Sequence, residues 1–151
     1  MGKKVTLGLI GLGGRGIGLL KTVFLHHEDV EFAAVCDVYE DRCQEAAELI
    51  EKSGRPRPQT TLDYKEILKM DAVDAVILCT SWENHLNLAI EFMEAGKYVG
   101  CEVGGAYTVQ ECWKIVDAYE RTHVPVMLLE NCVYGRDEMM VYHMSEMGVL
   151  G

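Results

Sequence analysis

The chain has 151 residues, of which 49% are hydrophobic and 25% are charged. These values describe one soluble globular domain and exclude disordered chains, collagens and miniproteins, because a chain of this length can fold without a metal or a disulfide framework. Asp and Glu outnumber Lys and Arg by 24 to 14, which gives a formal charge of −10 and disfavours binding to nucleic acid.

The six cysteines form no CxxC pair, so we expect reduced, mostly buried thiols in a cytoplasmic protein. Lys3 and Lys4 precede an apolar run as in a signal peptide, but glycines interrupt the run and no cleavage pattern follows. No apolar run approaches the roughly 20 residues of a membrane-spanning helix. The five histidines and six cysteines show no metal-ligand spacing. We therefore expect no membrane, nucleic-acid or metal partner.

Short apolar runs alternate with amphipathic stretches, as in a doubly wound α/β fold with a parallel sheet. The runs expected to form strands are Val5–Ile10, Glu31–Cys36, Thr60–Leu62, Val73–Thr80, Tyr98–Glu102 and Val124–Glu130. Between them, apolar residues recur at helical spacing. The four sets are Ile17, Leu20 and Phe24; Cys43, Ala46, Ala47 and Ile50; Leu86, Ala89, Ile90 and Met93; and Cys112, Ile115, Val116 and Tyr119.

Several boundaries of these elements carry recognisable capping or turn residues. Thr108 and Glu111 have the spacing of a capping box, and Gly96 stands where a glycine would end the preceding helix. Two prolines make residues 53–58 a surface loop. A last helical face is expected within residues 134–151.

A glycine-rich turn, Gly11-Leu12-Gly13-Gly14-Arg15-Gly16, lies between the first strand and the first helix. In this position a GxGxxG pattern is typical of dinucleotide binding. Gly11 makes the tight turn, Gly13 lets the backbone approach a pyrophosphate, and Gly16 lets helix and strand pack closely. Backbone N–H groups and the helix dipole would then hold the phosphates. The alternative is a turn whose glycines serve packing alone.

Asp37 ends the second strand, 21 positions after Gly16, close to the spacing of the ribose-binding acid in such folds. A carboxylate there accepts hydrogen bonds from the ribose hydroxyls and repels a 2′-phosphate, so the pattern favours NAD over NADP. The alternative is a solvated acid at a strand end. Arg42 could reach a 2′-phosphate, but we expect it to be a surface or ion-pair residue of the next helix.

Polar residues also follow the fourth strand, at the sheet edge where ligands of this fold class bind. Thr80 and Ser81 offer hydroxyls to a ribose or phosphate. Trp82 is placed to lie against the cofactor or, alternatively, to cover the strand end. His85 starts a helix, where a neutral imidazole is favoured over a charged one, so we expect it to be a hydrogen-bond partner of the cofactor.

Further polar residues follow the fifth and sixth strands at the same edge of the sheet, where they could contact the substrate or the nicotinamide. Glu102 follows the fifth strand, and Asn131 and Tyr134 follow the sixth. We predict cofactor contacts for Glu102 and Asn131, and catalytic roles for Glu102 and Tyr134. The alternatives are a capping or ion-pair carboxylate at Glu102 and a half-buried tyrosine that fixes a helix start at Tyr134.

Over all 151 residues the chain resembles the N-terminal half of the Gfo/Idh/MocA oxidoreductases, which pair a Rossmann domain with a C-terminal substrate domain. The resemblance implies that residues 1–151 are the NAD-binding domain of a larger two-domain protein and that the substrate domain is absent. It also implies a sugar-like substrate and assembly into dimers or tetramers. The segments that carry it are residues 11–16, Cys36-Asp37-Val38, Thr80-Ser81-Trp82 with His85, Ala95–Val99, Glu102, Thr108 with Glu111, and the final Gly148-Val149-Leu150-Gly151.

One segment departs from the family pattern. Glu102-Val103-Gly104 replaces the usual Glu-Lys-Pro, so the lysine that helps to place substrate and nicotinamide has no counterpart, and Lys97 belongs to another motif. With residues 130–136, this departure resembles a subgroup that contains NAD-dependent glycoside hydrolases. Glu102 and Tyr134 match the active-site positions of that subgroup.

Three hypotheses follow from these residues. The first is an NAD-dependent oxidoreductase acting on a CH–OH group of a sugar or polyol, of which this chain is the nucleotide-binding half and by itself inactive. The second is a redox-neutral glycoside hydrolase that uses NAD catalytically. The third is a nucleotide-binding module without chemistry, since one half of such a protein offers few walls around a substrate.

Overall fold

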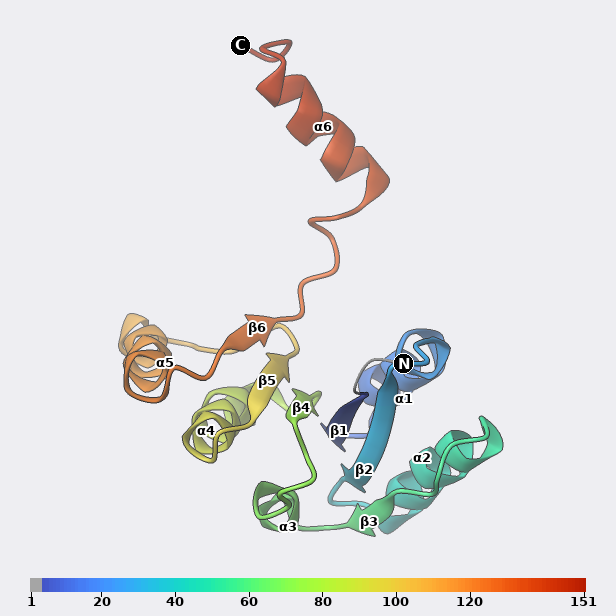
Figure 1. Ribbon diagram of the computed structural model, residues 1–151. Coiled ribbons are helices and arrows are strands. Elements are labelled where there is room, and N and C mark those ends of the chain that lie inside the picture. Colours follow the sequence, from blue (N-terminus) through green and yellow to red (C-terminus); the bar gives the residue numbers. More distant parts are fainter. Residues whose placement is uncertain (1–3) are drawn as a thin grey trace.

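A computed structural model describes residues 4–151 and shows one sheet flanked by helices (Figure 1). Lys3 of the basic pair lies outside the described residues. The strands are β1 (Val5–Ile10), β2 (Val30–Cys36), β3 (Gln59–Thr61), β4 (Ala75–Leu78), β5 (Tyr98–Cys101) and β6 (Val126–Leu128). All neighbouring strands pair in parallel, in the order β3-β2-β1-β4-β5-β6. This order is that of a Rossmann fold, and it confirms the predicted doubly wound sheet.

Helices cover both faces of the sheet. They are α1 (Gly14–Thr22), α2 (Glu40–Lys52), α3 (Tyr64–Leu68), α4 (Trp82–Glu94) and α5 (Val109–Thr122), with a 3₁₀ turn at Phe24–His26. A last helix, α6 (Arg136–Glu146), follows β6. Alternate residues of the central strand point to two separate cores. Leu7 and Leu9 pack with α1 and α2, whereas Ile10 packs with α3, α4 and α5. The sheet is therefore buried on both faces, as its apolar strands require.

The observed elements are shorter than predicted in several places. The strand expected at Val73–Thr80 is limited to Ala75–Leu78, because only these residues pair with β1 and β5. The helical spacing predicts Phe24 in the first helix, but this residue lies in the 3₁₀ turn. No pattern predicts α3, which has only five residues and begins where the Asp63 carboxylate accepts the N–H of Lys65.

Both predicted helix boundaries are confirmed. Thr108 and Glu111 form the reciprocal capping box of α5, and Gly96 has φ +76° directly after α4. The apolar stripe predicted for α5 is wrong in part, because Cys112, Val116 and Tyr119 are exposed and only Ile115 is partly buried. The helix packs against α4 near the last strand of the sheet, so only its side with Ala118 reaches the core.

The chain leaves the sheet after β6. Residues 129–135 form a connection to α6, which buries none of its residues and extends away from the sheet (Figure 1). Within residues 4–151 no helix is long and apolar enough to cross a membrane. Of the cysteines, Cys36, Cys43 and Cys101 are buried, and Cys112 and Cys132 are exposed.

Candidate functional site

Hydrogen bonds between strand ends gather the predicted site residues at one edge of the sheet. The Gly11 N–H donates to the Cys36 carbonyl at 2.9 Å, and the Cys79 N–H donates to the Ile10 carbonyl at 2.7 Å. The Glu102 N–H donates to the Leu78 carbonyl at 2.9 Å. These bonds extend the parallel ladder by one residue beyond β1, β4 and β5. The turns that follow the strands therefore begin side by side.

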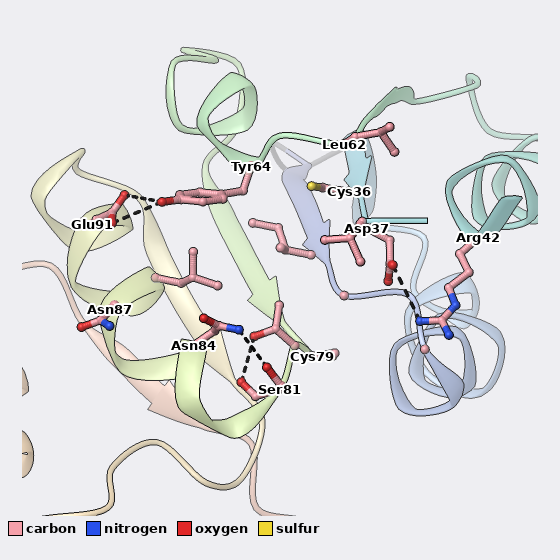
Figure 2. Close-up of a pocket in the computed structure, with 16 residues that line it drawn as sticks. Cys36, Asp37, Arg42, Leu62, Tyr64, Cys79, Ser81, Asn84, Asn87 and Glu91 are labelled. Atoms are coloured by element: carbon pink, nitrogen blue, oxygen red, sulfur yellow. Dashed lines mark hydrogen bonds and ion pairs between the residues drawn. The ribbon is translucent and has the colours of Figure 1, made fainter. Parts of the chain in front are cut away.

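A cleft of about 660 Å³ opens at this edge, between the ends of β1 and β2 on one side and the start of α4 on the other (Figure 2). Five of the predicted cofactor residues line it, namely Gly11, Gly13, Asp37, Thr80 and Ser81. Sequence reasoning missed other lining residues, among them Leu62, Tyr64, Asn84, Asn87 and Glu91. The cleft lies at the carboxyl ends of the strands, on either side of the central strand, where the order of connection reverses.

The glycine-rich turn divides into packing positions and open positions. Gly11 has φ +89°, and a Cβ there would lie 2.5 Å from the backbone carbonyl of Cys79. A Cβ on Gly16 would lie 2.0 Å from the Gly11 oxygen. In contrast, a Cβ on Gly14 would meet nothing within 4 Å, and one on Gly13 only the Arg42 guanidinium at 3.8 Å. The turn therefore fits a pyrophosphate at Gly13 and Gly14, on the backbone that begins α1.

Asp37 is buried at one side of the cleft, with 8% of its surface exposed. Its Oδ2 accepts the N–H of Leu12 at 2.6 Å, and its Oδ1 accepts the N–H of Tyr39 at 3.1 Å. An ionised carboxylate has about four lone-pair sites, so the group keeps acceptor capacity for ribose hydroxyls. Arg42 lies 3.7 Å from Oδ1 and makes the expected ion pair, while also lining the cleft (Figure 2).

His85 does not line the cleft. It is 1% exposed, and its Nε2 lies 3.0 Å from the Thr80 carbonyl. Because a carbonyl only accepts hydrogen bonds, Nε2 carries the hydrogen, and Nδ1 has no partner among residues 4–151. The imidazole thus holds the strand end that presents Thr80. The Ser81 hydroxyl accepts the Asn84 amide at 2.8 Å.

Trp82 also lies outside the cleft, where it is 58% exposed and covers Gly104. Gly104 has φ +101°, and a Cβ there would lie 2.5 Å from the indole ring. Proline fixes φ near −65°, so this backbone excludes the proline of the Glu-Lys-Pro pattern. The departure noted at residues 102–104 is therefore a difference in backbone conformation as well as in side chains.

Arg15 and Glu102 form an ion pair across the sheet edge. The guanidinium of Arg15 lies 2.8 Å from Oε1 of Glu102, whose side chain is only 12% exposed. The hydrogen bond from Arg15 to Glu102 raises the pKa of the guanidinium. Within residues 4–151, the side chain of Arg15 thus contacts a predicted catalytic carboxylate, and it orients that carboxylate beside the glycine-rich turn.

The residues after β6 are more exposed. The N–H groups of Cys132 and Asn131 donate to Glu130 at 2.7 and 2.8 Å and hold the pKa of its carboxyl below the usual range. Tyr134 is 77% exposed on the connection to α6 and does not line the cleft. The structure therefore places Glu102 at the sheet edge without bringing Tyr134 to it.

The thiols at this edge are neutral. Burial raises the pKa of Cys79 and of Cys36 to about 12, and that of Cys101 to about 11. Thiols with such pKa values stay protonated near neutral pH, and a protonated thiol is a poor nucleophile and metal ligand. In the part of the chain that the structure describes, no three His, Cys, Asp or Glu side chains are grouped to hold a metal ion.

A family model described as the oxidoreductase family with an NAD-binding Rossmann fold, Gfo/Idh/MocA, matches residues 5–129. The chain belongs to this family. All residues that line the cleft of this Gfo/Idh/MocA domain lie within the matched range. The family resemblance and the NAD cofactor predicted from the sequence are both confirmed.

Curated relatives of this Gfo/Idh/MocA chain carry glycosidase names. It is 44% identical to "Glycosyl hydrolase family 109 protein 1" of Shewanella sp. strain ANA-3, over 97% of this chain and 33% of that protein. It is 43% identical to "Alpha-N-acetylgalactosaminidase" of Shewanella oneidensis, with the same coverage. The chain thus spans about a third of the length of these relatives.

Solved dehydrogenases share the fold. A TM-score of 0.84 relates the chain to the WlbA dehydrogenase from Bordetella pertussis, in complex with NADH and UDP-GlcNAcA, at 22% identity over 97% of this chain and 43% of that one. Scyllo-inositol dehydrogenase from Lactobacillus casei, with bound NAD(H) and scyllo-inositol, gives 0.87 at 16% identity over 99% and 43%. At these identities the likeness shows the Rossmann architecture of the Gfo/Idh/MocA domain.

Proposed function

We propose that the protein is an NAD-dependent oxidoreductase acting on a CH–OH group of a sugar or polyol, and that residues 1–151 are its dinucleotide-binding domain. One observation carries this proposal: the open backbone at Gly13 and the carboxylate of Asp37 share one cleft, and the ion-paired Glu102 follows β5 at the same edge of the sheet. The isolated domain would bind the cofactor and catalyse little, because the other walls of a substrate site come from elsewhere.

Different residues of this domain would bind different parts of the cofactor and the substrate. Backbone N–H groups at Gly13 and Gly14 would hold the pyrophosphate, and Asp37 would accept the ribose hydroxyls. NAD, when bound, would supply a hydride acceptor. Glu102 is oriented by Arg15 at the sheet edge, so its carboxylate would bind a substrate hydroxyl and accept its proton. Tyr134 would join this site as a second proton-transfer group.

A second candidate is a redox-neutral glycoside hydrolase. It is favoured by relatives at 43 and 44% identity that are named as glycosidases, and by the Glu102-Val103-Gly104 segment with its positive φ at Gly104. In that chemistry a sugar carbon is oxidised, elimination and water addition replace the leaving group, and the hydride returns to the sugar. Glu102 and Tyr134 would act as proton-transfer groups in the elimination.

The two candidates differ in their use of NAD, and the full-length protein can separate them. A dehydrogenase forms one NADH for each sugar or polyol oxidised, which is followed at 340 nm. A glycosidase releases nitrophenol from a nitrophenyl N-acetyl-α-galactosaminide, requires NAD and accumulates no NADH. Failure of the full-length protein to form NADH with any member of a sugar and polyol panel contradicts the first proposal, and glycoside cleavage by cofactor-free protein contradicts the second.

The Glu102→Gln substitution tests the assigned role of the carboxylate in either reaction. We expect about a hundredfold loss of turnover, with NAD affinity within a few-fold of the wild-type value. Glu45→Gln is the matched control, since Glu45 makes an exposed ion pair with Lys21 of the same helix that carries Arg15. Equal losses of turnover in both variants would contradict the assignment.

Buried thiols also support a reducing compartment, and so a cytoplasmic location, because none of the cysteines among residues 4–151 forms a disulfide. A sugar-like small molecule is the proposed substrate. We also propose that the full-length protein self-associates, which light scattering of that protein would test.

A further inference from the structure

One face of α4 gives the cleft a row of polar side chains away from the glycine-rich turn. Asn84, Asn87 and Glu91 form this row, and the apolar Leu88 lines the cleft from the same helical face. The only cation among the lining residues, Arg42, lies beside Asp37 on the opposite wall (Figure 2). With a carboxylate and no cation, the α4 side disfavours a phosphate and favours a neutral group with N–H donors.

The Glu91 carboxylate is held in place by Tyr64. The Tyr64 hydroxyl donates to Oε2 at 3.0 Å and to Oε1 at 3.3 Å, and its ring packs 6.2 Å from that of the fully buried Phe92 (Figure 2). Burial and the hydrogen bond to Glu91 raise the pKa of Tyr64, so the hydroxyl remains a donor. Since the tyrosine uses one donor, the carboxylate can accept further hydrogen bonds from a ligand.

Asn87 adds a second polar group one helical turn before Glu91. Its amide makes no hydrogen bond to any of residues 4–151, although it lines the cleft. An amide can donate through nitrogen and accept through oxygen. The pair Asn87 and Glu91 therefore offers a donor and an acceptor side by side on one helix.

This pattern separates adenine from hypoxanthine. Adenine presents an amino donor next to the ring acceptor N1, whereas hypoxanthine presents a carbonyl acceptor next to an N1–H donor. We propose that Glu91, positioned by Tyr64 and assisted by Asn87, selects adenine in the cleft by accepting a hydrogen bond from its amino group. The inference rests on the proposed binding of NAD, and it makes Glu91 a specificity-determining residue for the base.

Calorimetric titration of the 151-residue chain with NAD and with nicotinamide hypoxanthine dinucleotide tests this assignment. We expect the wild-type chain to bind NAD about tenfold more tightly than the hypoxanthine analogue. In the analogue a carbonyl oxygen replaces the amino group, and a carbonyl cannot donate a hydrogen bond to the carboxylate of Glu91. Glu91→Gln should reduce this preference to less than about threefold, since a glutamine amide can turn its nitrogen toward a carbonyl. Tyr64→Phe should reduce it as well, with the carboxylate retained but no longer held.

Glu94→Gln is the matched control, because Glu94 lies on the same helix and pairs with Arg121 on the surface; it should leave the preference unchanged. Equal affinity of the wild-type chain for the two dinucleotides, or a preference that survives Glu91→Gln, overturns the assignment while leaving NAD binding intact. Failure of the wild-type chain to bind either dinucleotide overturns the proposed NAD binding itself, and the inference with it.

Discussion

The cleft and the segment after β6 differ in how firmly their predicted functional residues are held. In the cleft, Asp37 accepts two backbone N–H groups and Glu91 is held by Tyr64. After β6, Tyr134 is 77% exposed and α6 buries no residue. Contacts within the chain therefore fix the side chains of the cleft, whereas Tyr134 stays exposed on the segment after β6.

The same contrast appears within the set of predicted catalytic residues. Glu102 lies on the edge of the sheet and is fixed by Arg15. Tyr134 lies several residues after the end of β6 and does not line the cleft. Substitutions in the cleft should therefore change binding or stability strongly, and changes after β6 should leave the domain almost unaffected.

The largest effect is expected for Gly11→Ala. Its Cβ would lie 2.5 Å from the Cys79 carbonyl, and φ is +89°. We expect a loss of more than about 3 kcal/mol in the free energy of unfolding, together with loss of measurable NAD binding. Urea unfolding and calorimetric titration measure the two quantities.

Gly54→Ala provides the control for this variant. Gly54 also has positive φ, +86°, but a Cβ there would meet nothing within 4 Å. The cost should be limited to about 1 kcal/mol of backbone strain, with NAD affinity unchanged. Similar losses in the two variants would show that close packing of the turn against β4 contributes little.

A smaller, pH-dependent effect is expected at the start of α5. The N–H groups of Tyr107 and Thr108 lower the pKa of Glu111, so its carboxylate stabilises the folded state above its ordinary pKa of about 4.3. This contribution is lost as the pH falls through the lower folded-state pKa. Glu111→Gln should lower Tm slightly at pH 7 and converge with the wild type near pH 3.

The control for that series is Glu120→Gln, an exposed acid near the other end of α5. Its Tm should follow the wild-type curve at every pH. A Tm difference for Glu111→Gln that persists unchanged at pH 3 would mean that the capping carboxylate does not supply the stability assigned to it.

The smallest effect is expected for deletion of residues 133–151. These residues contain α6, none of which is buried, so the free energy of unfolding should change by less than about 0.5 kcal/mol and NAD affinity should not change. Thermal unfolding and calorimetric titration of the shortened chain measure both. A large loss of stability would show that α6 packs against the domain.

Much of the fold and part of the site could be predicted from the sequence. The β-branched runs and the glycine-rich turn carry their own local signals, and Asp37 follows from its spacing. The α4 row was missed because Asn87 and Glu91 look like an ordinary solvated helix face. The hydrogen bond from Tyr64 to Glu91 distinguishes this face from a solvated one, and Tyr64 lies on a five-residue helix that no sequence pattern predicts.

Side-chain direction accounts for the other differences. The prediction that His85 starts a helix is confirmed, but the rotation of α4 about its axis, which buries His85 and exposes Trp82, has no local signal in the sequence. Arg15 was assigned to the phosphate turn by its place in the motif. Its partner Glu102 comes from a strand 87 positions later, and no local pattern encodes such a contact.

The most direct test of the account is calorimetric titration of the chain with NAD and NADP, repeated on Asp37→Ala and on the control Asp41→Ala, an exposed acid in the first turn of α2. We predict that the wild-type chain and the control prefer NAD by at least about tenfold, and that Asp37→Ala reduces the preference below about threefold. Failure of the wild-type chain to bind NAD, or a preference for NAD that survives Asp37→Ala, would contradict the proposal that the cleft binds NAD and that Asp37 selects it over NADP.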